Sequence, residues 1–224
     1  MQINRINQLN YNQNQKTNKL SFGNIVRNNI PQKVVQEKMP RLFIVSGPSG
    51  VGKDTVIDSF NKMYGYFTKV VTSTTRNPRP QEIDGIHYNF LSPEQFKNGI
   101  KNNEFLEYVN VFADKFYGTR KSDVENILKQ GKNALLIIDV DGAKAIKEKN
   151  KDAVAIFIQP ESLNTLKEHL EKRGTETPET LKTRLGRAEY EINAGQNPNV
   201  YDAVIQNNNN IEENVNDFAK LLGL

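Results

Sequence analysis

The chain has 224 residues, enough for one large domain or a compact domain with mobile insertions, and a hydrophobic content of 37%. It contains no cysteine, which excludes a disulfide framework and a thiolate metal site and fits a reducing compartment such as the cytoplasm. It has no run of about 18 apolar residues, so we expect no membrane span. The formal net charge of +4 favours anionic partners without choosing among them.

The first 39 residues differ from the rest in composition. They contain nine Asn, six Gln, six basic residues and one acidic residue, Glu37. Such a segment cannot bury much apolar surface, so we expect residues 1–39 to be a disordered extension. The segment lacks the apolar centre of a secretory signal. Its basic, acid-poor character is a weaker sign of organelle import, which leaves a cytoplasmic location as the main expectation.

From Arg41 onward, short apolar runs alternate with helical patterns. Strands are predicted at 41–46, 67–72, 86–91, 104–113, 134–140, 153–158 and 201–206. Helices are predicted at 53–63, 92–101, 122–130, just after 140, and at 162–174, 177–194 and 211–222. The alternation predicts an α/β domain over residues 40–224, with a parallel sheet covered by helices on both faces. Residues 72–121 depart from this strand–helix alternation and indicate a hairpin-rich, mobile lobe.

The stretch GPSGVGKDT, residues 47–55, lies between a predicted strand and a predicted helix. Gly47, Gly52 and Lys53 have the spacing of the first part of a P-loop. Glycines let backbone N–H groups converge on phosphate oxygens, and the lysine adds a mobile cation. The expected ATP-binding residues of this loop are Gly47, Pro48, Ser49, Gly50, Val51, Gly52, Lys53, Asp54 and Thr55.

Asp54 stands where a P-loop normally has the Ser or Thr that touches Mg²⁺. Its carboxylate would repel ATP in the absence of Mg²⁺, but it could also ligate that hard cation. Thr55 lies one residue further, about 100° round the helix axis. Asp54 is therefore a candidate metal ligand, and the alternative is an acid that merely favours the first helical turn. We expect Asp54→Ser to keep activity and ease the Mg²⁺ dependence.

Two arginines, Arg76 and Arg79, lie three residues apart beside Pro78 and Pro80. Arginine binds phosphate through two parallel hydrogen bonds, and a proline-stiffened loop holds such a pair at low entropic cost. They are candidates for binding a second phosphorylated substrate, with the hydroxyl groups of Tyr88 and Tyr117 as further donors. The alternative is that the two arginines face solvent.

Six stretches occur in one order: VSGPSGVGK, TSTTRNPRPQEIDGIHYNF, NNEFLEY, YGT, RGTETPETLKTRL and YDAVIQN. Together they resemble the guanylate kinase family of P-loop nucleoside monophosphate kinases over residues 41–224. The resemblance implies a P-loop kinase fold with a core of residues 40–71, 122–172 and 195–224, a β-rich GMP-binding lobe at 72–121 and a mobile lid at 173–194. It also implies direct in-line phosphoryl transfer from ATP to GMP, and to dGMP, with Mg²⁺.

The resemblance assigns roles to individual residues. It implies that the GMP phosphate is held by Arg76, Arg79, Tyr88 and Tyr117, and the guanine by Thr72, Glu107, Thr119 and Asp139. It implies that the transferring group meets Lys53, Arg173, Arg184 and Arg187, and that Asn207 contacts adenine. Carboxylates only accept hydrogen bonds, so Glu107 and Asp139 suit the N1–H and N2 amine of guanine.

Several residues keep alternatives open. Asp139 could simply cap a helix before Gly142, and Arg187 could be a surface charge paired with nearby Glu residues. Ile137 and Asp141 stand where the family often has an acid and Gln, respectively. His87 and His169 are expected to be structural or exposed.

The functional alternatives are a catalytically weak protein-interaction module and a kinase with another phosphorylated acceptor. No aromatic–basic pattern supports nucleic-acid binding. The sequence does not choose between a monomer and a homodimer.

Overall fold

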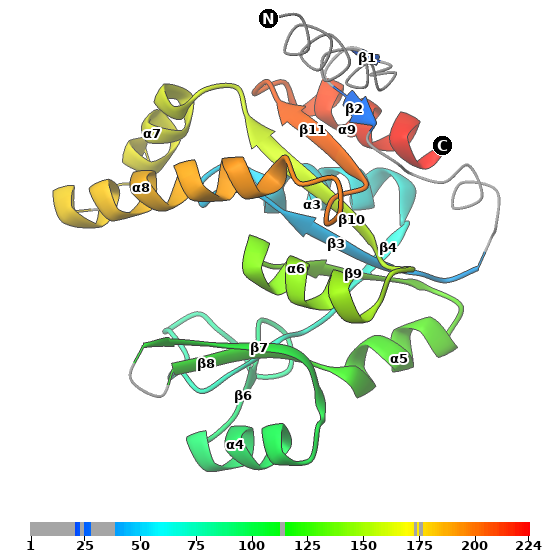
Figure 1. Ribbon diagram of the computed structural model, residues 1–224, viewed down its shortest axis with the longest axis vertical. Helices are drawn as coiled ribbons and strands as arrows, with labels where there is room; N and C mark the ends of the chain where they lie inside the picture. Colours follow the sequence, from blue (N-terminus) through cyan, green and yellow to red (C-terminus); the bar gives the residue numbers. More distant parts are fainter. Residues whose placement is uncertain (1–20, 23–24, 28–38, 113–114, 173, 175–176) are drawn as a thin grey trace, which may run out of the picture.

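The computed structural model describes residues 21–22, 25–27, 39–112, 115–172, 174 and 177–224. Its core is a seven-stranded sheet in the order β1-β2-β11-β10-β3-β9-β4 (Figure 1). The five central strands run parallel: β3 (Leu42–Ser46), β4 (Phe67–Lys69), β9 (Asn133–Ile137), β10 (Val154–Pro160) and β11 (Ala203–Asn207). The predicted α/β class with a parallel core is confirmed.

The central strand β3 is apolar from Leu42 to Val45 because helices cover both faces of the sheet. Phe43 and Val45 pack into one core with Phe60 and Phe218, whereas Leu42 and Ile44 pack into the other. The first face is covered by α3 (Lys53–Tyr64) and α9 (Ile211–Leu222), and the second by α5 (Lys121–Lys129) and α6 (Val140–Lys149). None of the described helices is long and apolar enough to cross a membrane.

Two short strands from the N-terminal extension join this sheet. β1 (Ser21–Phe22) pairs antiparallel with β2 (Ile25–Arg27), and β2 pairs antiparallel with β11, the outermost parallel strand on that side. The expectation of disorder across residues 1–39 therefore does not hold for these five residues. Backbone pairing along an open strand edge can recruit a segment whose composition alone predicts no structure.

Residues 73–120 contain a second sheet in the order β6-β5-β8-β7. In Figure 1 this lobe lies beyond α6, away from the core sheet. Its helix α4 begins with a capping box of Ser92 and Gln95, and the lobe has a small core of Phe96, Phe105 and Phe116. The elements are β5 (Ser73–Thr74), β6 (Asn89–Phe90), α4 (Pro93–Lys101), β7 (Phe105–Phe112) and β8 (Lys115–Arg120).

The predicted strand 86–91 is wrong over its first three residues. The N–H groups of Ile86 and His87 donate to the carbonyl of Ile83, and the ring Nδ1 of His87 accepts from the N–H of Ile83. These bonds form a local turn, so the strand begins only at Asn89. The alternating pattern of the segment does not reveal this turn.

Two helices form the arm drawn in yellow and orange in Figure 1, α7 (Leu163–Lys172) and α8 (Pro178–Gly195). Thr177 is the N-cap of α8, and Pro178 is its first residue. Leu181 and Leu185 of α8 pack against the first core, which α7 enters through Leu166 and Leu170. The predicted lid residue Arg173 lies outside the described residues.

Candidate active site

The loop from Gly47 to Gly52 connects β3 to α3 at the carboxyl end of the strand. At Gly47 an added Cβ would lie 2.3 Å from the carbonyl oxygen of Ile158, so only glycine fits there. Gly52 has a φ of 89°, in the left-handed region, at the N-cap of α3. The Nζ of Lys53 donates to the carbonyls of Gly47 at 2.7 Å and Pro48 at 2.9 Å, which places its ammonium over the loop.

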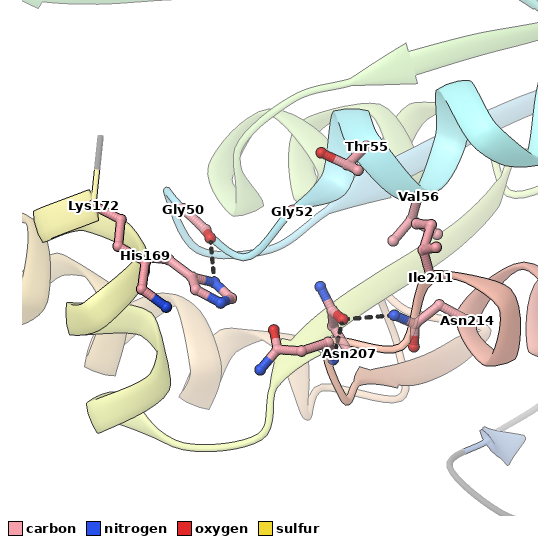
Figure 2. A pocket seen from close by; sticks show the side chains of 10 residues that line it. Gly50, Gly52, Thr55, Val56, His169, Lys172, Asn207, Ile211 and Asn214 are labelled. Carbon is pink, nitrogen blue, oxygen red and sulfur yellow. Dashed lines mark hydrogen bonds between the residues drawn. The ribbon is translucent and has the colours of Figure 1, made fainter. Parts of the chain in front are cut away.

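A cavity of about 280 Å³ lies behind this loop (Figure 2). Its lining residues come from α3, α7, β11 and α9 and are Gly50, Gly52, Thr55, Val56, His169, Lys172, Asn207, Asn209, Ile211 and Asn214. The cavity therefore joins the start of α3 to the end of β11. The expected ATP-binding residues Thr55 and Asn207 share it.

Asn207 is buried and its side chain supports the phosphate loop. Its Nδ2 donates to the carbonyl of Val51 at 2.5 Å, and its Oδ1 accepts from the N–H of Asn209 and from the Nδ2 of Asn214 at 2.6 Å. Figure 2 shows Asn207 turned toward Asn214. The structure thus gives Asn207 a role in holding the loop, beside the adenine contact expected from the sequence.

His169 belongs to this cavity, although the sequence indicated only a structural or exposed residue. Its Nδ1 lies 3.2 Å from the carbonyl oxygen of Gly50 (Figure 2). Lys172 lies three residues further along α7 and lines the same cavity. The spacing of the two residues places them on one helix face, which is the only sequence signal that could have linked them.

Asp54 is exposed in the first turn of α3, and its Oδ1 accepts from the Nζ of Lys69 at 2.9 Å. Among the described residues, no group of three or more His, Cys, Asp or Glu side chains could hold a metal ion. Proteins commonly hold Mg²⁺ through one or two carboxylates together with substrate phosphates and water. A single carboxylate at the phosphate loop fits that role.

A second cavity, of about 340 Å³, lies between the small lobe and the start of α6. It brings together five residues expected around GMP: Thr72, Tyr88, Tyr117, Glu107 and Asp139. Ile137 also lines it and packs against the first core, so this position supplies apolar surface and no acid.

Glu107 and Asp139 both line this second cavity. Glu107 Oε1 accepts from the hydroxyl of Thr119 at 2.7 Å, and Asp139 Oδ1 accepts from the N–H of Gly142 at 2.8 Å as the N-cap of α6. A Cβ on Gly142 would lie 3.3 Å from Asp139 Oδ1 and 3.6 Å from Glu107 Oε2, so the two carboxylates flank one glycine. Burial raises the pKa of Glu107, and Asp139 adds to the effect.

Thr119 itself is fully buried and bonds to Glu107, so its observed contact is to the carboxylate. Asp139 caps α6 as its alternative interpretation expected and also lines the cavity, while its contact with guanine stays a prediction. Gly142 was not identified from the sequence as part of the site.

Arg76 is held in place by Glu82. Its two terminal nitrogens donate to the carboxylate at 2.6 and 2.8 Å, and its Nε donates to the hydroxyl of Tyr117 at 3.2 Å. The guanidinium also lies 5.2 Å from the ring centre of Tyr88. Glu82 also accepts a hydrogen bond from the backbone N–H of Arg79, which is an exposed residue. The hydrogen bonds from Arg76 lower the pKa of Glu82 to about 2.

Glu82 is therefore an organiser of the arginine loop that sequence reasoning missed. The available signal was an acid placed six residues after one arginine and three after the other. A compact proline-containing loop brings such residues together.

The two described lid arginines differ in what they contact. Arg184 donates to the hydroxyl of Ser49 at 2.6 Å, which brings α8 to the phosphate loop. Arg187 pairs with Asp141 and Glu191, and the hydroxyl of Tyr190 donates to the same Asp141 at 2.6 Å. Arg187 thus has carboxylate partners, as in the alternative drawn from the sequence, although one of them lies on α6.

Comparison with known proteins gives a consistent result. The sequence model described as "Guanylate kinase" matches residues 39–223. The chain is 45% identical to a guanylate kinase of Clostridium perfringens over 179 residues, which cover 77% of this chain and 82% of that protein. It is 48% identical to a guanylate kinase of Porphyromonas gingivalis over 158 residues, covering 69% and 83%. The crystal structure of guanylate kinase from Anaplasma phagocytophilum superimposes with a TM-score of 0.62 at 30% identity, covering 84% of this chain and 87% of that one.

Proposed function

The chain belongs to the guanylate kinase family, and we propose that it transfers the γ-phosphoryl group of ATP directly to the phosphate of GMP or dGMP. The observation that supports this most strongly is the pairing of two cavities at one end of the core sheet. One adjoins the phosphate loop, and the other contains the carboxylates Glu107 and Asp139. Open α/β sheets bind ligands at the carboxyl ends of their strands.

Catalysis in this proposal needs alignment and charge neutralisation. The phosphate of GMP, with a second pKa near ~6, is largely ionised at neutral pH, so no general base is required. Lys53 and the loop amides bind the β- and γ-phosphates, and Arg184, already at Ser49, neutralises the group in transfer. Asp54 would hold the Mg²⁺ that arrives with ATP, and the bound metal would supply further charge neutralisation.

The acceptor is chosen by hydrogen-bond complementarity. Glu107 and Asp139 accept from N1–H and the N2 amine of guanine, with Thr72 beside them, whereas adenine offers no donor at either place. A buried carboxylate left without a donor is costly, so discrimination against AMP reaches ~10⁴. Arg76, Arg79, Tyr88 and Tyr117 bind the GMP phosphate at the other end of the cavity.

An acceptor panel tests the proposal. ADP formation is followed by a coupled assay with GMP, dGMP, AMP and UMP, each with and without Mg²⁺. We expect turnover with GMP and dGMP in the presence of Mg²⁺. A folded protein that forms no ADP with any acceptor would contradict the assignment and favour an interaction module. Preference for another monophosphate would contradict the proposed acceptor.

A further inference from the structure

The phosphate loop is followed directly by an acidic residue, although the ligand proposed to bind there is a polyanion. Asp54 directly follows Lys53, and both belong to the first turn of α3. A carboxylate at this place adds negative charge where a triphosphate has to bind. The structure pairs this acid with a cation, because Lys69 donates to Asp54 Oδ1 at 2.9 Å.

Lys69 comes from a different part of the core. It is the last residue of β4 and lies in register with Leu135 of β9, at the strand end that faces the site. The side chains of Lys69 and Asp54 are 55% and 64% exposed, so both remain accessible to a ligand at the loop. Three residues after Lys69 the chain reaches Thr72 in the second cavity.

An exposed ion pair of this kind contributes little to folding. Its effect on a polyanionic ligand is a separate matter, because the ligand responds to the summed charge near the loop. With Lys69 in place the two side chains together add no net charge, and without it they add one negative charge. The Asp54–Lys69 pair therefore matters for nucleotide binding more than for stability.

We propose that Lys69 is a charge-compensating residue of the ATP site, which neutralises Asp54 and so lets this altered phosphate loop bind the triphosphate. The proposal deepens the proposed function, because it concerns the same donor site. The compensation matters most in the absence of Mg²⁺, when Lys69 is the cation paired with Asp54 among the residues that the structure describes. When Mg²⁺ is present, the metal shares that role.

A double-mutant cycle on ATP binding tests the proposal. The dissociation constant of ATP is measured by calorimetry for the full-length wild type, Lys69→Gln, Asp54→Asn and the double variant, in EDTA and in Mg²⁺. We expect Lys69→Gln to weaken binding about tenfold in EDTA, or about 1.4 kcal/mol, and less in Mg²⁺. In the Asp54→Asn background the same change is expected to alter binding less than twofold.

Lys129→Gln is the matched control, because Lys129 forms a similarly exposed pair with Glu125 on α5. It is expected to leave ATP binding unchanged. Melting temperatures of all variants are expected to stay close to that of the wild type. The KM for GMP is expected to change less than twofold in Lys69→Gln.

Two outcomes would overturn the proposal. Equal weakening by Lys69→Gln in both backgrounds would mean that Lys69 binds ATP independently of Asp54. No weakening of ATP binding in EDTA would mean that Asp54 and Lys69 form an ordinary surface ion pair with no effect on the nucleotide. Because binding is measured without turnover, a protein that shows the cycle yet phosphorylates no GMP would contradict the proposed function alone.

Discussion

The donor side and the acceptor side of this site are built differently. On the donor side, nine consecutive residues form the phosphate loop, and the core holds the loop through Asn207 and the close approach at Gly47. On the acceptor side, residues between Thr72 and Asp139 converge from two sheets, and Arg76, Glu107 and Asp139 each have a polar partner. The donor site therefore depends on backbone shape, and the acceptor site depends on side-chain pairs.

The donor and acceptor sides also differ in the size of the hydrophobic core that stabilises them. The phosphate loop rests on a core of more than twenty buried residues, whereas the small lobe has Phe96, Phe105 and Phe116. A lobe with so small a core unfolds locally more easily than the central sheet. We therefore expect substitutions on the acceptor side to act mainly on GMP binding, and those in the support of the donor loop to act on stability as well.

The largest effect is expected at the lid arginine that contacts the phosphate loop. Arg184→Ala removes the guanidinium next to Ser49, and we expect kcat to fall about 10³-fold, the range known for arginines that stabilise phosphoryl transfer. The KM values are expected to change little. Arg187→Ala is the comparison, because Arg187 is paired with Asp141 and Glu191, and its kcat is expected to fall tenfold or less. Equal losses in the two variants would show that Arg184 has no special role.

The donor loop is tested by Asn207→Ala. The change leaves the N–H of Asn209, the Nδ2 of Asn214 and the carbonyl of Val51 without their observed partner. Asn209 is exposed, so its N–H can bond to water, whereas the other two groups are buried and cost about 1–3 kcal/mol each when unsatisfied. We expect the KM for ATP to rise about tenfold and the free energy of unfolding, measured in urea, to fall by about 2 kcal/mol. A higher KM with unchanged stability would indicate a direct contact with ATP only.

The arginine loop is tested by Glu82→Gln. Only one amide oxygen remains to accept from Arg76, so we expect the KM for GMP to rise about fivefold while the KM for ATP stays constant. The pKa of Glu82 is lowered to about 2, so its contribution to stability is present above pH 4.5 and is lost as the pH falls toward 2. The melting temperatures of variant and wild type are therefore expected to converge in acid. A constant difference down to pH 2 would rule out this ion pair as the cause.

The smallest effect is expected on stability at Glu107. Burial raises the pKa of this carboxyl, so the folded protein loses stability as the pH rises from the ordinary value of 4.5 through the raised value. Gln has no such charge and still accepts from Thr119. We expect Glu107→Gln to melt slightly higher than the wild type at pH 8 and equally at pH 4. A lower melting temperature at pH 8 would contradict this account of the buried charge.

Sequence patterns predicted the parts of the fold that depend on local rules. The helix at 211–222 is observed with the same bounds, and the capping box at Ser92 is present. The prediction failed where long-range pairing decides. β2 is a strand because β11 offers an open edge, and β8 is a strand because β7 and β5 lie on either side of it. Composition and periodicity do not contain that information.

The site divides in the same way. The phosphate loop was predictable because its residues are consecutive and flanked by a strand and a helix. The partners of the loop's polar groups were not predictable. Arg184 contacts Ser49 from 135 residues further along the chain, and Lys69 contacts Asp54 from another strand. Glu82 and Asp141 were missed as partners for the same reason: an ion pair depends on how the chain folds back.

The central claim is that Glu107 and Asp139 read the donor edge of guanine opposite the phosphate loop. The most direct measurement is the ratio of kcat/KM for GMP to that for AMP, in the wild type and in Glu107→Gln. We predict a wild-type ratio of about 10⁴ that falls at least a hundredfold in the variant, because the loss is confined to GMP. An equal loss for both acceptors, or an unchanged ratio, would contradict the claim.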